Sequence, residues 1–264
     1  MIIVEWTKPG VWIEGLDRDV AWRISGQIRC LEEAIIEANV TLNMFEQARA
    51  SYQTMERTGA KFEAHSEISR AVEAELFPDG MIQMEMQGDG FREDYDERRV
   101  LMDTYVRHRM WQSGFLPKSF LRMPQFIFAK AFIHALDLFD RVLEGIAKDS
   151  SAPKNIKDIR KNFCNSLPDL REVRNSIQHA EDRSKGEKYG KKIDLKEIDG
   201  SKISIGGTAL VNNGLDGNRF GTTMANGDYG AIDVSVQTIN VLRSALLDVY
   251  SAFAWTGGKS VYPH

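Results

Sequence analysis

The sequence predicts a mainly α-helical protein: a helical bundle with a small β-hairpin insertion before the last helix. Two observations lead to this fold class. Long segments with almost no proline place apolar residues three and four positions apart, as on one face of an α-helix. A shorter segment, 191–233, instead alternates polar and apolar residues and is crowded with turn dipeptides. The 264 residues are 42% hydrophobic and 27% charged, which is ordinary for a globular chain of this length.

The first helical segment follows residues 1–18, which we expect to form an irregular arm or a short strand. Over 18–56 only Gly26 interrupts the apolar pattern, which predicts one long helix or two joined helices. A loop is expected over 78–90, and Pro117 and Pro124 are expected to bracket a linker. The further helices are predicted over 63–76, 93–111, 126–147, 155–165, 166–183 and 234–255.

The helix predicted over 166–183 has a recognisable start. Ser166-Leu167-Pro168-Asp169 resembles a capping box, with proline in the first turn. The helix is expected to end before Gly186.

The expected β insertion is marked by its turns. Its strands are predicted over 192–195 and 202–205. Tight turns are predicted at five dipeptides that supply positive φ angles: Asp199-Gly200, Gly206-Gly207, Asn213-Gly214, Asp216-Gly217 and Asn226-Gly227. Polar residues of 206–230 either make these turns or form a lip beside the helices. The domain organisation predicted from this pattern is an N-terminal helical extension over 1–90, a bundle with the insertion over 91–255, and a tail over 256–264.

Charge and composition exclude several classes of protein. No apolar run is long enough to span a membrane. The two cysteines fit neither a metal site nor a disulfide framework, and no secretory signal is visible, so a cytoplasmic protein is expected. The net charge is −4, yet residues 154–192 hold 11 Lys and Arg against 6 Asp and Glu, a local balance of +5. This asymmetry is consistent with an anionic partner or with a solvated basic helix face.

The chemically suggestive segment is Arg174-Asn175-Ser176-Ile177-Gln178-His179. On a helical wheel Asn175 and His179 lie opposite the apolar side and are i, i+4 neighbours, with Gln178 beside them. Arg174 lies near the edge of the apolar side. The alternative is an ordinary polar helix face, with the arginine paired to Asp169, Glu172 or Asp182.

This segment resembles the Arg-polar-x-x-x-His signature of HEPN domains. A long apolar helix before it, over 126–137, and a closing helix after it extend the resemblance to about residues 90–255. The resemblance implies a helical bundle that forms homodimers, tolerates an insertion between its last two helices, and in many members cleaves RNA without metal. It also suggests a role in toxin–antitoxin or defence systems, with an antitoxin as partner.

Elementary chemistry assigns roles to these residue types. Histidine titrates near neutral pH and can serve as general acid or base, and arginine grips phosphate oxygens. We therefore expect Arg174, His179 and Asn175 to be catalytic, with two copies of His179 facing each other in a dimer. Cleavage would leave 2′,3′-cyclic phosphate ends and need no cofactor or metal. The residues expected to bind substrate are Arg171, Gln178, Arg183 and Lys185.

Two alternatives to cleavage are compatible with the same residues. The same groove could bind RNA or a nucleotide without cleaving it. The chain could instead be a non-enzymatic interaction or scaffold protein, which would show a large exposed apolar stripe. Acidic partners for both Arg174 and His179 within one subunit would weaken the site hypothesis. His134, on an apolar helix, is expected to be a core or interface residue, or to face His179.

Overall fold

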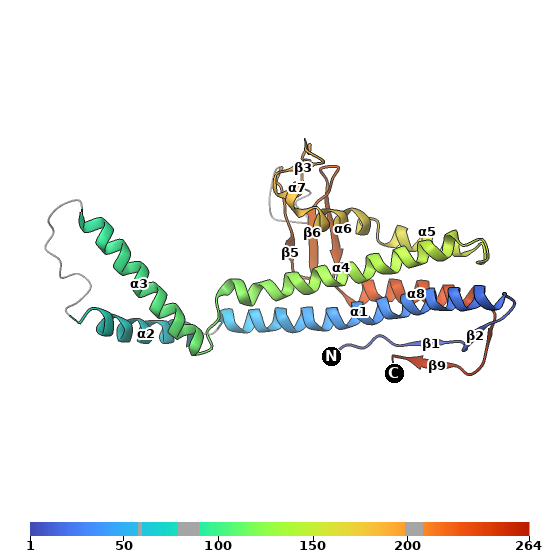
Figure 1. The fold of residues 1–264 in the computed structure, drawn as a ribbon, viewed down its shortest axis with the longest axis horizontal. Coiled ribbons are helices and arrows are strands. Elements are labelled where there is room, and N and C mark those ends of the chain that lie inside the picture. The colour runs from blue at the N-terminus through green and yellow to red at the C-terminus, as the bar shows by residue number, and fades with distance from the viewer. Residues whose placement is uncertain (58–59, 79–89, 199–207, 264) are drawn as a thin grey trace. The chain divides into compact units, whose positions relative to one another are not determined.

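The computed structural model describes residues 1–57, 60–78, 90–198 and 208–263 (Figure 1). The fold is mainly helical with small antiparallel sheets, which confirms the predicted class. The chain forms two compact units: Met1–Gln47 with Gln125–His264, and Ala48–Pro124. Among the described residues, no helix combines the length and apolarity that a membrane crossing requires.

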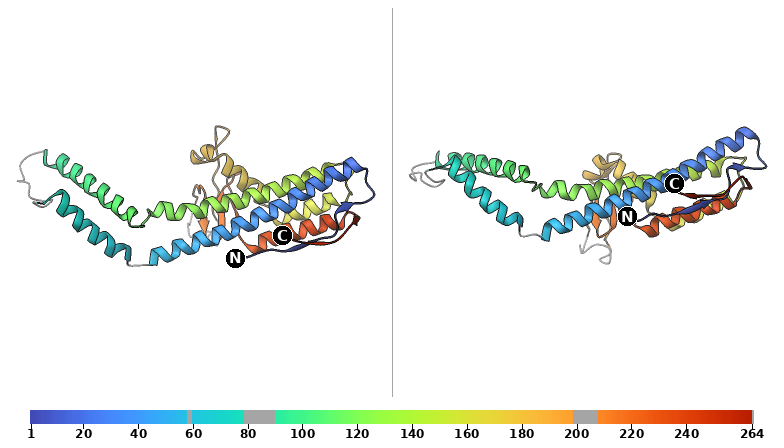
Figure 2. Two further views of the ribbon diagram at one scale, coloured as in Figure 1. Left: turned by 60° about the horizontal axis from the view of Figure 1, so that its bottom comes forward. Right: turned by 90° about the horizontal axis from the view of Figure 1, so that it is seen from below.

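The first unit is built around three helices, α1 (Arg18–Arg57), α4 (Lys118–Lys148) and α8 (Val236–Ser251). Figures 1 and 2 show α1 and α4 running side by side within this unit, with α8 along them. Their apolar faces share one core, whose fully buried residues include Ile28, Leu31, Phe132, Leu136, Leu242 and Leu246. The boundary predicted at residue 90 is therefore wrong for this unit, because the start of α1 packs in the same core as the C-terminal helix.

The long N-terminal segment forms one helix rather than two. Gly26 lies inside α1, where a glycine keeps helical geometry although it favours the helix less than alanine does. The linker predicted between Pro117 and Pro124 is wrong, because α4 begins at Lys118 and contains Pro124. A proline in the second turn removes one backbone hydrogen bond. The buried side chains further along α4, such as Phe132 and Ile133, hold the helix in the core in spite of this loss.

The next three helices are α5 (Ile156–Ser166), α6 (Leu170–Gln178) and α7 (Ala180–Ser184). The predicted cap at Ser166 is wrong: Ser166 ends α5, and its hydroxyl donates to the Asn162 carbonyl at 3.0 Å. The side chain of Asp169, which precedes α6, accepts from the Ala231 backbone N–H at 3.2 Å and so joins α6 to the sheet. The single helix predicted over 166–183 is interrupted at Leu167–Asp169 and again at His179.

The predicted β insertion is present, and it contains more strands than expected. A short hairpin pairs β3 (Glu187–Lys188) with β4 (Lys191–Lys192). A three-stranded antiparallel sheet follows, made of β5 (Gly214–Asp216), β6 (Arg219–Thr223) and β7 (Tyr229–Asp233). Phe220 of β6 and Ile232 of β7 pair across this sheet and are buried in the main core.

Three of the predicted turn dipeptides carry a positive φ angle: Asn213 at 56°, Gly217 at 60° and Gly227 at 86°. The strand predicted over 192–195 reaches only Lys192, because residues 193–195 lie outside any strand. The predicted turns at Asp199-Gly200 and Gly206-Gly207, and the strand predicted over 202–205, lie outside the described residues.

The two ends of the chain pair with each other. β1 (Trp6–Lys8) pairs antiparallel with β9 (Ser260–Tyr262), and β2 (Trp12–Ile13) pairs with β8 (Trp255–Thr256) (Figure 1). The Trp6 ring is buried and stacks on Tyr262, with ring centroids 5.9 Å apart. The last helix therefore ends at Ser251 instead of 255, and the predicted tail is part of the sheet structure.

The second unit contains α2 (Ala60–Leu76) and α3 (Gly90–Gln112), close to the helices predicted over 63–76 and 93–111. They pack through a small apolar cluster of Val72, Val106 and Met110. The predicted loop over 78–90 lies almost entirely outside the described residues.

Candidate functional site

Arg174 lies on α6 with its guanidinium turned into the protein. Its side chain is 11% exposed, and its Nη2 lies 2.8 Å from Oδ2 of Asp137 on α4, whose side chain is 8% exposed. The Arg174 Nη1 also donates to Asn175 Oδ1 at 2.9 Å and to Gln178 Oε1 at 2.8 Å. The guanidinium is thus held by one carboxylate and two amides of its own chain.

Asp137 is the centre of this polar cluster. Arg141, one helical turn further along α4, contacts the same carboxylate oxygen through Nε at 2.8 Å. Burial raises the pKa of the Asp137 carboxyl because the charged form loses its water, and the Arg141 guanidinium partly opposes this effect. The Arg174 guanidinium on this buried carboxylate fixes the side of α6 against α4, while Arg141 contacts the carboxylate from within α4. Arg174 therefore has a clear structural role.

Asn175 and Gln178 lie on the same side of α6 as the Arg174 guanidinium, and both accept a hydrogen bond from it. Asn175 is half-buried and Gln178 is exposed. Both side chains orient Arg174, and they do so through their oxygens. Their amide N–H groups make no hydrogen bond within the described residues, so these groups remain available to a ligand at the surface.

His179 occupies the junction where α6 ends and α7 begins. Its backbone N–H closes α6 by donating to the Asn175 carbonyl at 3.0 Å, and its φ of −105° and ψ of 43° break the helix. The half-buried imidazole makes no hydrogen bond or ion pair with any described residue. The ring instead faces Tyr189 edge to face, with ring centroids 6.2 Å apart. Of Arg174 and His179, only Arg174 is therefore paired with an acid.

The four predicted substrate-binding residues fall into two groups. Arg171, Gln178 and Lys185 are exposed. Arg183 is 3% exposed, and its guanidinium donates to Ser176 Oγ at 3.3 Å and to the Glu187 carbonyl at 2.5 Å. Arg183 therefore ties α7 to α6 and to the β3–β4 hairpin. The exposed His134 of α4 is no core residue in this chain.

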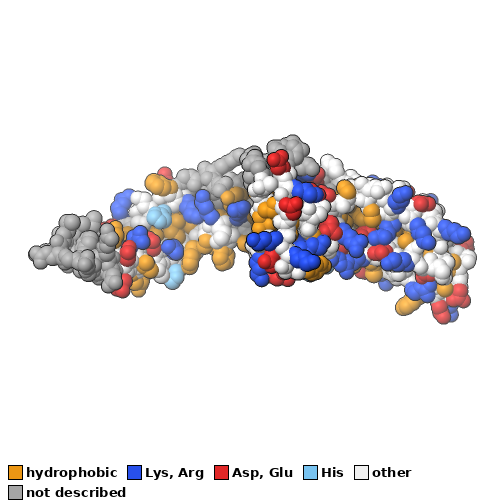
Figure 3. All heavy atoms as spheres, turned by 90° about the horizontal axis from the view of Figure 1, so that it is seen from above, with side chains coloured by type: hydrophobic (Ala, Val, Ile, Leu, Met, Phe, Trp, Pro, Cys, Tyr) orange, Lys and Arg blue, Asp and Glu red, His pale blue; other side chains and the backbone are white. Residues whose placement is uncertain are grey.

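The β3–β4 hairpin carries a cluster of exposed cations beside His179. Lys185, Lys188, Lys191 and Lys192 are exposed, against a single acid, Glu187, within 185–192. Figure 3 looks onto this face and shows Lys and Arg side chains there, mixed with acidic ones. A hollow of about 420 Å³ lies under the hairpin, lined by three of the lysines, Tyr189, Asp194 and Asn226 among others.

The tip of the hairpin is unusual. Tyr189 and Gly190 form its two-residue loop, with φ angles of 51° and 75°. Asn or Asp normally precedes glycine in such a loop, because few side chains tolerate a positive φ. Tyrosine at this position is mildly strained and 77% exposed. We name His179, Tyr189, Lys185, Lys188, Lys191 and Lys192 the hairpin patch.

Sequence reasoning missed Tyr189, the hairpin lysines other than Lys185, and Asp137. Tyr-Gly is not a strong turn signal, so nothing local marked residues 187–192 as a hairpin. The excess of basic residues over 154–192 was the available signal for the lysines. Asp137 carries no such signal, because its role depends on how α4 packs against α6.

Neither the search for a metal site nor the comparison with known proteins suggests a function for this chain. Within the described part of the chain, no group of three or more His, Cys, Asp or Glu side chains could hold a metal ion. Comparison of the chain with protein families, with curated proteins and with solved structures found no significant match. A proposal for the function of this chain therefore depends on its own geometry.

Proposed function

We propose that this protein binds single-stranded RNA on the hairpin patch. The observation that carries the proposal is the strained, exposed Tyr189 set between lysines and against the His179 ring. Exposed aromatic rings stack on bases, and lysines nearby neutralise phosphates, which is how proteins bind single strands without reading their sequence. The resemblance of residues 174–179 to the HEPN signature, on the helix beside the patch, points to the same ligand.

Arg174 has a supporting role in this proposal. Its guanidinium is paired with Asp137 and with two amides, so it holds α6 in place instead of presenting a free charge to phosphate. The phosphate contacts come from the lysines of the patch, which have no such partners among the described residues.

The test is RNA binding measured by fluorescence anisotropy over a range of salt concentrations. Four lysines on phosphates predict that log K falls with log salt at a slope of about −3, since each contact on a single strand contributes roughly −0.7. Changing Lys188, Lys191 and Lys192 to glutamine should reduce the slope to about −1. The matched control changes three exposed lysines of the α5 region, Lys154, Lys157 and Lys161, and should leave the slope unchanged.

A second variant separates stacking from folding. Tyr189→Asn places a residue suited to positive φ in the hairpin loop, so the fold should be as stable as wild type or more stable. Loss of the ring should weaken RNA binding by about 1–3 kcal/mol. Unchanged affinity in Tyr189→Asn and in the Lys188, Lys191 and Lys192 variant would overturn the proposal.

Metal-independent cleavage is the second candidate function. One observation favours it: the His179 imidazole has no hydrogen-bond partner among the described residues, so both ring nitrogens can exchange a proton with RNA. A single histidine supplies one proton shuttle, so cleavage with both a general acid and a general base would use His179 of two copies. RNA incubated in EDTA should then give 2′,3′-cyclic phosphate ends with wild type and not with His179→Ala. Intact RNA with wild type restricts the function to binding.

A further inference from the structure

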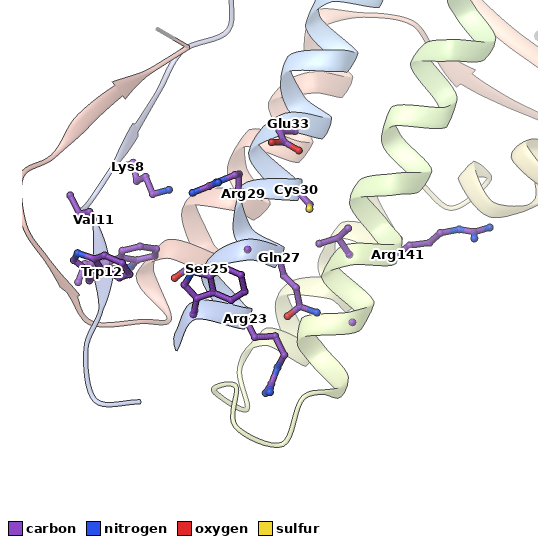
Figure 4. A pocket seen from close by; sticks show the side chains of 15 residues that line it. Lys8, Val11, Trp12, Arg23, Ser25, Gln27, Arg29, Cys30, Glu33 and Arg141 are labelled. Carbon is purple, nitrogen blue, oxygen red and sulfur yellow. The ribbon is translucent and has the colours of Figure 1, made fainter. Parts of the chain in front are cut away.

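A separate pocket of about 800 Å³ lies in the first unit, between the N-terminal arm, α1 and α4. Its volume is in the range of pockets that take a small molecule. None of the hairpin-patch residues lines it, so a ligand bound here would be independent of the proposed RNA binding. Figure 4 shows its side chains from close by.

The wall of this pocket is rich in tryptophan. Trp12, Trp22 and Trp255 all line it. Trp12 is 58% exposed and Trp22 is 73% exposed, which is costly for large apolar rings. Indole faces that remain open to solvent are suited to stack on a planar ring.

The charge of the wall is mainly positive. Lys8, Arg23, Arg29 and Arg141 line the pocket, against the single carboxylate of Glu33. Three of these cations pair with carboxylates outside the lining: Lys8 with Glu32 at 2.8 Å, Arg23 with Asp149 at 2.7 Å, and Arg141 with Asp137 at 2.8 Å.

Arg29 differs from the other three cations. It makes no ion pair within the described residues, although Glu33 lies one helical turn further along α1. In Figure 4 the side chains of Lys8 and Arg29 point toward each other across the pocket, whereas Arg141 points away. Lys8 already pairs with the buried Glu32, so Arg29 is the lining cation that can hold an anion, and a guanidinium binds phosphate oxygens in bidentate fashion.

Two polar atoms in the wall lack partners. The Ser25 Oγ and the Gln27 Oε1 are buried and make no hydrogen bond with any described residue. Beside them Gly26 leaves space, because a Cβ built there would meet nothing within 4 Å. Each of these two polar atoms exposes less than 1 Å², so a ligand in the pocket would contact them only after their side chains turn.

We propose that this pocket binds a mononucleotide, with the base against the tryptophans and the phosphate on Arg29. An aromatic pocket could also hold a quaternary ammonium group. Arg29, the lining cation without a carboxylate partner among the described residues, opposes that ligand and favours an anionic one. Tryptophan rings and a guanidinium in one pocket match a nucleoside monophosphate better than free phosphate.

The test uses the full chain and four ligands, AMP, GMP, CMP and UMP, followed by tryptophan fluorescence and calorimetry. We expect saturable binding of at least one of them, and much weaker binding of inorganic phosphate, adenosine and choline. Arg29→Gln should weaken the binding about tenfold, since it removes a charged hydrogen bond. Lys161→Gln removes an exposed charge from α5 and is the matched control.

A pocket-filling variant distinguishes loss of the site from loss of the fold. Gly26→Leu lies in a helix and meets open space, so the protein should be at least as stable as wild type while the ligand is excluded. No binding of any of the four nucleotides at millimolar concentration, equal binding of phosphate alone, or unchanged binding in Gly26→Leu would each overturn the proposal. The RNA experiment is unaffected by these outcomes, because it reports on the hairpin patch.

Discussion

The buried ion pair between Arg174 and Asp137 allows a quantitative prediction. In Asp137→Asn the carboxylate charge is lost while the shape of the side chain is kept. Arg174 would then remain 11% exposed with neutral amide acceptors alone, from the new side chain at position 137, Asn175 and Gln178. Leaving one partner of a buried pair without its counter-charge costs about 3–5 kcal/mol. We therefore expect the free energy of unfolding to fall by this amount.

The assay is urea unfolding of four proteins: wild type, Asp137→Asn, Arg174→Gln and the double variant. The two single changes should not add, because the double variant leaves no buried charge uncompensated, and a coupling energy on the order of 2–3 kcal/mol is expected. Arg141→Gln is the control. Arg141 contacts the same carboxylate oxygen but is 58% exposed, so its loss should cost less than about 1 kcal/mol.

A cost below about 1 kcal/mol for Asp137→Asn would refute this reasoning. It would mean that Arg174 is easily released from Asp137, and the guanidinium could then serve phosphate as the HEPN resemblance implies. The measurement therefore also decides how an inactive Arg174 variant should be interpreted. A loss of RNA cleavage in such a variant would reflect catalysis only if the protein remains folded.

Three further predictions concern other parts of the fold. Tyr250→Phe removes the hydrogen bond that the hydroxyl donates to buried Glu32 at 2.7 Å and should cost about 1.5–3 kcal/mol. Burial also raises the pKa of Tyr250, because the charged phenolate would lose its water. Above pH ~10 the free energy of unfolding of the wild type should therefore fall, relative to that of Tyr250→Phe, by about 1.4 kcal/mol per pH unit. A difference between the two unfolding free energies that stays constant with pH in urea unfolding would contradict this. Gly227→Ala should cost about 2–3 kcal/mol in thermal unfolding, because the added Cβ would overlap the Asp194 carbonyl oxygen; a melting temperature equal to that of wild type would show that the turn can shift. Ser235→Ala removes the cap of α8 and should cost about 1 kcal/mol, whereas Ser235→Asp should restore the stability.

The helices were predictable from the sequence because their signal is local. Apolar periodicity located α1 and α8 to within a few residues. The turn dipeptides marked 191–233 as a β insertion, although the strands predicted there, 192–195 and 202–205, were not those of the β5–β6–β7 sheet. The errors arose where a distant contact decided the outcome. Ser166 stands where the sequence predicts a helix cap. The Asp169 carboxylate instead accepts a hydrogen bond from the Ala231 backbone N–H, and α6 begins directly after Asp169.

The candidate site was predictable only in part for the same reason. The helical wheel correctly placed Arg174 near the apolar side of its helix, yet its partner Asp137 belongs to another helix. The wheel also assumed a helix unbroken through His179, and the break there turns His179 toward Tyr189. A tyrosine at positive φ has no local signature, so the tip of the β3–β4 hairpin required a structure.

The pairing of β1 with β9 has a consequence for synthesis. The ribosome makes the chain from the N-terminus, so Trp6 leaves the exit tunnel long before Tyr262, the residue on which its ring stacks. Until that strand arrives, the arm has only its contacts with helices such as α1, where the Val4 N–H donates to Asn39 Oδ1 at 2.8 Å, and closing so long a loop carries an entropic cost. The helices can therefore pack together during translation, but the β1 strand gains its pairing partner and the Trp6 ring its stacking partner only after residue 262 has been added.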